Sequence, residues 1–194
     1  MNLVIVGTSR CGKTMLSNML FKQLPNYNKI QIDGLKDTFK EVFPELEIDF
    51  SKKGKGNEEL FPRFLERYFD RCIYKDNQEG NFYLIDGAGL PEDSILRFSK
   101  KDNTKVIFLG KTQISPQDYF DQIRKYETTY SYGGWTKRLD DATLFSWATD
   151  WIRKSQKYKA FCEENNLLFF DTSFNQVEVL QDIIDRLKEN RLWS

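Results

Sequence analysis

Residues 7–14 read GTSRCGKT and match the pattern G-x-x-x-x-G-K-[ST], which is typical of a phosphate-binding loop. Glycines in this pattern let the backbone curl, and the N–H groups of successive residues then surround an anion. Lys13 would reach the β- and γ-phosphates, and the Thr14 hydroxyl would bind Mg²⁺. The pattern therefore predicts a nucleoside triphosphate with magnesium as the ligand, and we expect MgATP. The residues expected to contact the nucleotide are Gly7, Ser9, Arg10, Cys11, Gly12, Lys13, Thr14 and Met15.

A turn of small residues leading into a helix would also fit this stretch, with Lys13 simply solvated. The context favours the loop, because the apolar run Leu3–Val6 precedes it directly and a helical pattern follows it. We expect Lys13 to be solvated when no ligand is bound, so that Lys13→Ala abolishes turnover without unfolding the chain. Cys11 either fills space in the loop or is a reactive thiol, since helix N-termini lower thiol pKa values.

Asp86 follows the apolar run Phe82–Ile85 directly. A hydrophobic strand that ends in an aspartate is the form of a Walker B carboxylate, which holds Mg²⁺ directly or through water. Together with Thr14, Asp86 is therefore the predicted magnesium ligand. The alternative interpretation is an ordinary turn at Asp86-Gly87.

Asp33 follows a second short apolar run, Ile30–Ile32, and is the candidate for the acceptor side of the reaction. Phosphoryl transfer to a hydroxyl needs an aligned nucleophile, and a carboxylate can accept its proton or a hydrogen bond from it. The chain contains no histidine, so an aspartate or glutamate must supply a side-chain base of ordinary pKa. A turn at Asp33-Gly34 is again the alternative.

Four basic residues flank an aromatic, glycine-containing stretch over 128–135, which we interpret as part of a lid over 124–138. They are Arg124, Lys125, Lys137 and Arg138. Lid arginines stabilise charge on the transferring phosphoryl group, and closure excludes water. Arg124 and Arg138 are the predicted catalytic pair, together with Lys13 and Asp33. Solvated charge at helix ends explains the same residues equally well, and Trp135 either stacks on a ring or packs locally.

Five short apolar runs alternate with helical patterns along the chain. The strands are expected at 3–6, 30–33, 82–85, 106–109 and 167–170, and the helices at 13–24, 34–43, 57–73, 91–100, 115–127, 140–162 and 175–189. The stretch over 44–57 is expected to be a loop. This alternation predicts an α/β fold with a doubly wound parallel sheet and helices on both faces, in one domain over 1–194. Ligands bind at the carboxyl ends of such strands, where the loop, Asp33 and Asp86 all lie.

Composition excludes several classes of function. Lysine plus arginine and aspartate plus glutamate both number 29, so the net charge of zero does not favour nucleic acid as a partner. No run of 18 apolar residues is present, so we expect no membrane span. The lack of histidine removes Ser-His-Asp triads and most zinc sites. Three widely spaced cysteines and no visible signal peptide indicate reduced thiols in a cytoplasmic protein.

The chain resembles the small P-loop kinases of the nucleoside and nucleotide kinase group, which includes adenylate, shikimate and gluconate kinases. The likeness rests on the loop at 7–14, on Ile32-Asp33-Gly34 and on Ile85-Asp86-Gly87. Adenylate kinases continue the last of these with Phe-Pro-Arg. This chain continues with Ala88-Gly89-Leu90-Pro91 and lacks that arginine.

The resemblance implies a P-loop NTPase sheet in the order 2-3-1-4-5 and a lid between the fourth strand and the long helix, which fits residues 124–138. It also implies that residues 34–76 close over the phosphoryl acceptor. The function that follows is transfer of the γ-phosphoryl group of MgATP to a small molecule, such as a nucleoside, a nucleotide or another hydroxyl compound. The oligomeric state and the acceptor are left open.

Two other classes compete with a kinase. A regulatory ATPase or GTPase would share the loop, although the chain has no Asn-Lys-x-Asp motif to bind guanine and no Asp-x-x-Gly after the third strand. A degenerate kinase fold used only for interaction is the third interpretation. Intact Lys13, Thr14 and Asp86 argue against it.

Overall fold

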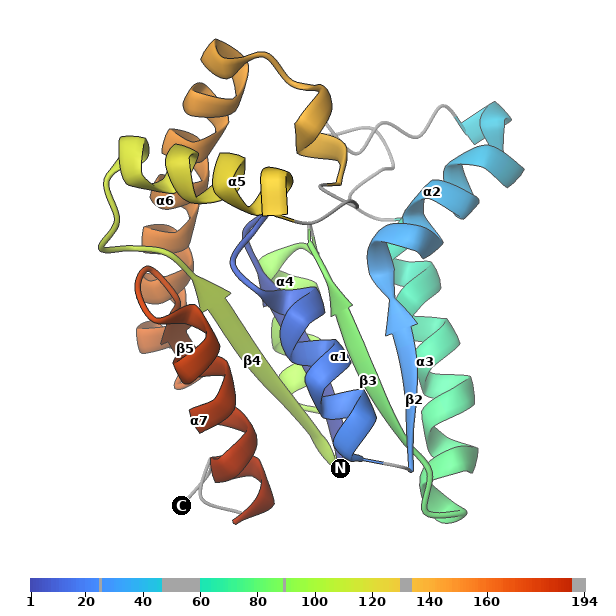
Figure 1. Ribbon diagram of the computed structural model, residues 1–194. Helices are drawn as coiled ribbons and strands as arrows, with labels where there is room; N and C mark the ends of the chain where they lie inside the picture. Colours follow the sequence, from blue (N-terminus) through green and yellow to red (C-terminus); the bar gives the residue numbers. More distant parts are fainter. Residues whose placement is uncertain (25, 47–59, 89, 130–133, 190–194) are drawn as a thin grey trace. The chain divides into compact units, whose positions relative to one another are not determined.

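The apolar runs of the sequence form one parallel sheet of five strands, in the order β2-β3-β1-β4-β5, with helices around it (Figure 1). This confirms the predicted fold class and strand order. The computed structural model describes residues 1–24, 26–46, 60–88, 90–129 and 134–189. The strands are β1 (Asn2–Gly7), β2 (Tyr27–Gln31), β3 (Phe82–Gly87), β4 (Thr104–Gly110) and β5 (Leu168–Asp171).

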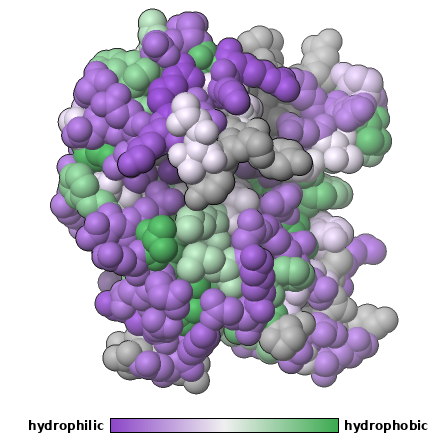
Figure 2. Space-filling view, viewed as in Figure 1, coloured by the Kyte–Doolittle hydropathy of each residue, from purple (hydrophilic) through white to green (hydrophobic). Residues whose placement is uncertain are grey.

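Seven α-helices and two short 3-10 helices are described. They are α1 (Lys13–Gln23), α2 (Ile32–Val42), α3 (Leu60–Gln78), α4 (Glu92–Ser99), α5 (Pro116–Thr129), α6 (Asp141–Glu164), α7 (Gln176–Lys188), η1 (Pro44–Leu46) and η2 (Trp135–Arg138). Within the described part of the chain, no helix is both long enough and apolar enough to cross a membrane. On the face shown in Figure 2, hydrophilic side chains cover most of the described surface, in keeping with a mean hydropathy of −0.60.

The chain divides into two compact units by its internal contacts. Unit 1 comprises Met1–Val6 and Lys13–Ile107, and unit 2 comprises Gly7–Gly12 and Phe108–Ser194. The first six residues of the phosphate-binding loop therefore belong to unit 2, and the rest of the loop, from Lys13 onward, belongs to unit 1.

Unit 1 is built around β3, which lies between β1 and β2. The register places Asp86 level with Ile5 on one side and with Gln31 on the other. Continuous apolar strands such as β1 form here because side chains on both faces are buried. The fully buried residues that pack in this unit include Leu3, Ile5, Leu16, Leu20, Phe61, Leu65, Phe69, Leu84, Ile85 and Phe98.

Unit 2 packs α5 against α6 through a small apolar cluster, made of Ile114, Tyr119, Ile123, Leu144, Ala148 and Ile152. Both helices begin at capping residues. The Ser115 hydroxyl accepts a hydrogen bond from the Asp118 N–H at 3.1 Å, and the Asp140 carboxylate accepts one from the Thr143 N–H at 2.8 Å. Such caps satisfy N–H groups that have no partner within the helix.

Three details differ from the sequence-based expectation. The second strand ends at Gln31, so Asp33 lies in the first turn of α2 rather than at the end of a strand over 30–33. An acidic side chain is favourable there because it faces the positive end of the helix dipole. Figure 1 shows α2 continuing from the carboxyl end of β2. Asp86 is still part of β3. Trp135, the last residue of the stretch over 128–135 that was expected to be a loop, begins η2 (Trp135–Arg138).

Some predicted features lie outside the described residues. These are Pro25 as the end of the first helix, most of the loop over 44–57, the helix start at 57–59, and residues 130–133 of the predicted lid.

Candidate nucleotide-binding site

The phosphate-binding loop starts at the last residue of β1, where a close backbone contact requires a glycine. A Cβ atom at Gly7 would lie only 2.0 Å from the carbonyl oxygen of Leu109. Further along, Arg10 has a φ of 60° and Gly12 a φ of 101°, both in the left-handed region. Left-handed residues curl such a loop so that successive N–H groups line an anion-binding concavity.

Donors from unit 2 hold three carbonyl groups of the loop. The Tyr119 hydroxyl donates to the Ser9 carbonyl oxygen at 2.5 Å, and the Thr172 hydroxyl donates to that of Cys11 at 2.9 Å. The Cys11 thiol lies 3.0 Å from the carbonyl oxygen of Thr8 and donates to it. In a trans peptide the N–H points opposite to the C=O. Anchoring these carbonyls therefore turns the following N–H groups toward the other side of the loop, where a phosphate would bind.

The Thr8 side chain is anchored as well. A serine hydroxyl has a single proton, and Ser155 on α6 donates it to the Trp151 carbonyl oxygen at 2.8 Å. The Thr8 hydroxyl, 3.0 Å away, is therefore the donor to Ser155. The Lys111 N–H, at 3.1 Å, also donates to the Ser155 oxygen. This serine thus connects the loop with α6 and with the residue that follows β4.

Lys111 is a buried cation, with only 2% of its surface exposed. Its ammonium group donates to the carbonyl oxygen of Thr172 and, at 3.0 Å, to the side-chain oxygen of Gln122. Burial disfavours the charged form and lowers the pKa of Lys111 to about 8. A substantial fraction of these ammonium groups is therefore neutral at mildly alkaline pH.

Asp171, at the end of β5, is held by Thr112 and Ser173. Its carboxylate accepts from the Ser173 N–H at 2.8 Å, from the Thr112 N–H at 3.2 Å, and from the Thr112 hydroxyl. Burial alone would raise the pKa of Asp171, but these hydrogen bonds outweigh burial and lower it. The carboxylate is charged at neutral pH. It links the segment after β4, at Thr112, to the segment after β5, at Ser173.

The sequence analysis missed these residues, although the signal was present. Polar residues follow the fourth and fifth apolar runs, as Lys111-Thr112 and Asp171-Thr172-Ser173. That is the same pattern that drew attention to Asp33 and Asp86.

In unit 1, Lys13, Thr14 and Met15 form the start of α1. The expectation that Lys13 is solvated was wrong, because its exposed fraction is only 8%. The long aliphatic part of a lysine packs readily against its surroundings. Thr14 and Met15 are exposed.

Asp86 is a buried carboxylate with unused hydrogen-bonding capacity. It is 3% exposed, and among the described residues its Oδ2 atom has no hydrogen-bond partner. The ammonium group of Lys29 lies 3.7 Å from Oδ2 and donates to the Asn18 side chain at 2.5 Å. Asp86 and Lys29 therefore form a loose ion pair in unit 1.

This arrangement fits a divalent cation. Magnesium prefers oxygen ligands, and a buried carboxylate oxygen without a hydrogen-bond partner is such a ligand. Magnesium in nucleotide sites typically takes only one or two protein ligands together with phosphate oxygens. Among the described residues, no cluster of three or more histidine, cysteine, aspartate or glutamate residues could hold a metal by itself.

Asp33 joins α2 to the segment that follows β3. Its carboxylate accepts from the Ala88 N–H at 3.3 Å and from the Lys36 ammonium group at 3.4 Å. Lys36 also donates to the Ala88 carbonyl oxygen. The side chain of Asp33 is 63% exposed, so most of the carboxylate is accessible. Asp33 is thus bonded to the backbone two residues after Asp86, within unit 1. Lys36 is a further polar group there that the sequence analysis missed.

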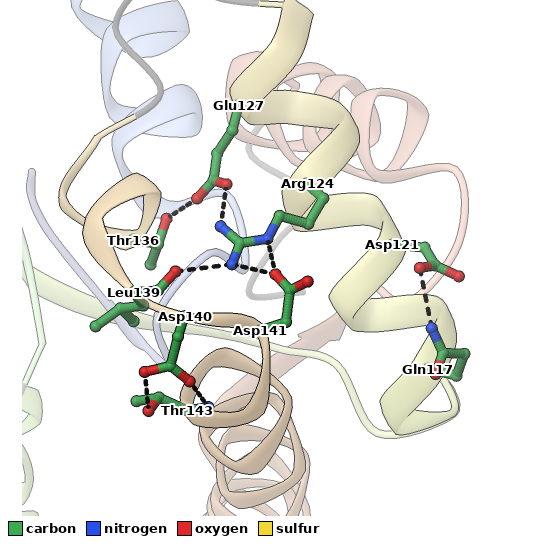
Figure 3. Close-up of polar contacts among 9 residues, drawn as sticks. All are labelled: Gln117, Asp121, Arg124, Glu127, Thr136, Leu139, Asp140, Asp141 and Thr143. Atoms are coloured by element: carbon green, nitrogen blue, oxygen red, sulfur yellow. Dashed lines mark hydrogen bonds and ion pairs between the residues drawn. The ribbon is translucent and has the colours of Figure 1, made fainter.

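Arg124 forms hydrogen bonds and ion pairs between elements of the predicted lid region (Figure 3). Its guanidinium donates to Glu127 at 2.8 Å, to Asp141 at 2.7 Å and to the Leu139 carbonyl oxygen at 2.8 Å. These contacts join α5 to the end of η2 and the start of α6. Arg138, by contrast, is exposed on η2. Of the two predicted lid arginines, Arg124 is partly buried by these contacts and Arg138 is exposed.

The Cys11 side chain is fully buried. It is also fixed by its contact with the Thr8 carbonyl, as described above. This position favours the interpretation of Cys11 as a packing residue of the loop over that of a reactive thiol, because a thiol that solvent cannot reach is poorly reactive.

No protein-family model matches the chain, and no curated protein is significantly similar to it in sequence. Similarity is found among solved structures. One of them is shikimate kinase from Bacteroides thetaiotaomicron, with a TM-score of 0.57 and 18% sequence identity over 97% of this chain and 98% of that chain. The likeness shows that this chain has the fold of a small P-loop kinase.

Proposed function

We propose that this protein is an ATP-dependent phosphotransferase that moves the γ-phosphoryl group of MgATP to a hydroxyl group of a small molecule. The observation that carries the proposal is the anchoring of the loop carbonyls of Ser9 and Cys11 by Tyr119 and Thr172. A loop held in this way presents its N–H groups to phosphate without further rearrangement, and such preorganisation is what electrostatic catalysis requires. The small P-loop kinase fold supports the same class of reaction.

In this proposal the residues of the loop have separate tasks. The N–H groups over 7–14 bind the phosphates, and Lys13 neutralises charge on the β- and γ-phosphates. Thr14 and Asp86 would hold Mg²⁺, which supplies Lewis-acid stabilisation of the charge on the phosphate oxygens. Lys29 balances the charge of Asp86 when no metal is bound.

The acceptor would be bound on the side of Asp33. Its exposed carboxylate accepts a hydrogen bond from the acceptor hydroxyl and, as the bond to phosphorus forms, takes up the proton. The Ala88 N–H holds the same carboxylate in place. Residues 34–76 would contribute further contacts to the acceptor, and residues 124–138 would cover the transferring group, with Arg124 and Arg138 as its cationic partners.

A turnover assay tests the proposal. The protein is incubated with MgATP and a panel of nucleosides, nucleotides, sugars and hydroxy acids, and ADP formation is measured with and without each compound. We expect one chemical class to stimulate ADP formation, and Asp33→Asn to reduce transfer much more than ATP binding. Lys36→Met is the matched control, because it removes the cation beside Asp33 and leaves the carboxylate in place.

The alternative is a P-loop nucleotide-binding protein without an acceptor, such as a regulatory ATPase. ADP formation that occurs at the same rate with every compound and with none would favour that alternative. Absence of MgATP binding would exclude both.

A further inference from the structure

Arg10 is the residue of the loop whose side chain the proposed function does not yet use. Its φ of 60° is unfavourable for a residue with a Cβ atom, and glycine would adopt this conformation without strain. A large side chain held in such a conformation at a ligand site suggests that the side chain has a task. Its contacts indicate what the task is.

The guanidinium of Arg10 contacts η2 and the residue before it. It donates a hydrogen bond to the Thr136 hydroxyl, and its central carbon lies 5.5 Å from the centre of the Tyr126 ring. The backbone at Gly134 passes so close that a Cβ atom there would lie 2.7 Å from Nη2 of Arg10. Residues 134–136 therefore fit closely around this cation, all within unit 2.

Thr136 connects Arg10 with a buried carboxylate, that of Glu127. Thr136 is fully buried and donates its single hydroxyl proton to Glu127, so that it accepts from Arg10 (Figure 3 shows the Thr136–Glu127 bond). Glu127 is 4% exposed and also accepts from Arg124. Burial alone would raise the pKa of Glu127, but the bonds from Thr136 and Arg124 outweigh it and lower the pKa. The hydroxyl that Arg10 binds is thus itself hydrogen-bonded to a charged, buried carboxylate.

We propose that Arg10 couples phosphate in the loop to the position of η2, with Thr136 and Glu127 as positioning residues. The proposal rests on nucleotide binding at 7–14. Without ligand, the anionic group that faces Arg10 is Glu127, one hydroxyl away. A bound phosphate offers the same guanidinium a second anion, and a guanidinium that moves toward the phosphate lengthens its bond to Thr136. Phosphate binding therefore weakens the bond to Thr136 and releases η2, which carries Arg138.

Linkage determines the sign of the effect of each substitution. Coupling is reciprocal: if phosphate weakens the bond between Arg10 and Thr136, that bond weakens nucleotide binding by the same factor. A substitution that removes the bond therefore strengthens nucleotide binding, by up to that factor. Thr136→Val keeps the shape of the buried side chain and removes the hydroxyl. Glu127→Gln keeps a hydrogen-bonding group and removes the charge. Both variants are expected to bind nucleotide more tightly than the parent, by about fivefold or more.

The experiment combines calorimetric titration with MgADP and hydrogen–deuterium exchange of residues 134–139. In the parent protein we expect MgADP to speed exchange in this segment. In Arg10→Gly the segment should exchange fast with or without MgADP, and adding Thr136→Val to that variant should leave its affinity unchanged. Thr149→Val is the matched control, because it removes a threonine hydroxyl that donates to a helix carbonyl, that of Phe145. It should bind MgADP as the parent does.

Three results would overturn the coupling. One is unchanged exchange of 134–139 together with equal affinities of Thr136→Val and Thr149→Val. Another is weaker binding by Thr136→Val, which would mean that Thr136 positions Arg10 for phosphate. If Thr136→Val does not fold, Glu127→Gln supplies the same comparison, with Glu66→Gln, a carboxylate paired with Arg97, as its control. The third result, no heat from MgADP with the parent protein, would refute nucleotide binding itself and is distinguishable from the other two.

Discussion

At the scale of single residues, the site depends on buried donors that do not touch the ligand. These donors are Tyr119, which is 1% exposed, and the buried residues Lys111 and Thr172. Tyr119 and Thr172 donate to carbonyl groups of the loop, and Lys111 donates to the carbonyl group of Thr172. Each is satisfied by a backbone carbonyl. Leaving a buried polar group of this kind unpaired costs about 1–3 kcal/mol. A substitution that removes one of these donors should therefore change the conformation of the loop even when the packing is preserved.

The anchoring of Ser9 can be tested with Tyr119→Phe. Loss of the hydroxyl leaves the Ser9 carbonyl free to turn toward the bound phosphate, which it repels. We expect affinity for MgADP to fall about tenfold, equivalent to about 1.4 kcal/mol. Tyr27→Phe is the control in calorimetric titration, because Tyr27 also donates to a carbonyl oxygen, that of Met1. Equal affinities of the two variants would contradict the role of Tyr119.

Lys111 predicts a pH dependence of stability. Its pKa is about 8 in the folded protein and near the ordinary 10.5 in the unfolded chain. Between these values the unfolded chain binds more protons, so this group makes folding more favourable as pH rises. Below about pH 8 both states are protonated, and the full cost of burying the charge is present. The span corresponds to about 3 kcal/mol.

Urea unfolding from pH 7 to 10.5 measures this effect against Lys111→Met. The free energy of unfolding of the parent, relative to that of Lys111→Met, should rise from pH 7 to pH 10.5. The control is Lys154→Met, at an exposed lysine, and the parent should show no such rise relative to this variant. Parallel pH profiles for the parent and Lys111→Met would show that the lysine titrates at its ordinary value.

At the scale of elements, η2 and the start of α6 are held to α5 by Arg124, and η2 carries two exposed cations, Lys137 and Arg138. Arg124 connects α5, Leu139 and Asp141, whereas Arg138 projects from η2 into solvent. The two arginines of the predicted lid are therefore not equivalent. A substitution at Arg124 removes several contacts between α5, η2 and the start of α6, so that loss of activity there would not separate catalysis from folding.

Arg138→Ala is the cleaner test of the lid. If Arg138 stabilises the transferring phosphoryl group, kcat should fall about 100-fold or more. Because the side chain is exposed, the free energy of unfolding should change by no more than about 0.5 kcal/mol. Lys137→Ala, the neighbouring exposed cation on η2, is the control in the turnover assay. Similar small losses in both variants would indicate that η2 supplies only general surface charge.

At the scale of the whole molecule, a ligand that binds only the folded chain must stabilise it. With MgATP at 100 times its dissociation constant, we expect the free energy of unfolding to rise by about 2.7 kcal/mol. Lys13→Met should lose most of this gain, because it removes the charge while keeping an unbranched side chain in a position that is only 8% exposed. Thermal unfolding with and without MgATP measures both effects. Unfolding midpoints that MgATP leaves unchanged in the parent would contradict nucleotide binding.

Much of the fold could be predicted because its signals are local. Short apolar runs, helical spacing and capping residues such as Ser115 and Asp140 depend on neighbours in the sequence, and the structure confirms the parallel sheet they predicted. The boundary at Asp33 was wrong because a short apolar run fits a strand end and a helix start equally well. Local pattern could not decide between them.

The sequence by itself determined the loop at 7–14, the strand that leads into it and the aspartate at the end of β3, because glycine, lysine and threonine at fixed spacing have a chemical meaning before folding. Only the tertiary structure decided what holds that loop. Tyr119, Thr136 and Thr172 lie more than a hundred residues from it in sequence and carry no motif of their own. Their role exists because packing of α5, η2 and the end of β5 brings single donors and acceptors within hydrogen-bonding distance. Burial, which no local pattern reports, likewise decided that Lys13 is enclosed and that Lys111 titrates near pH 8.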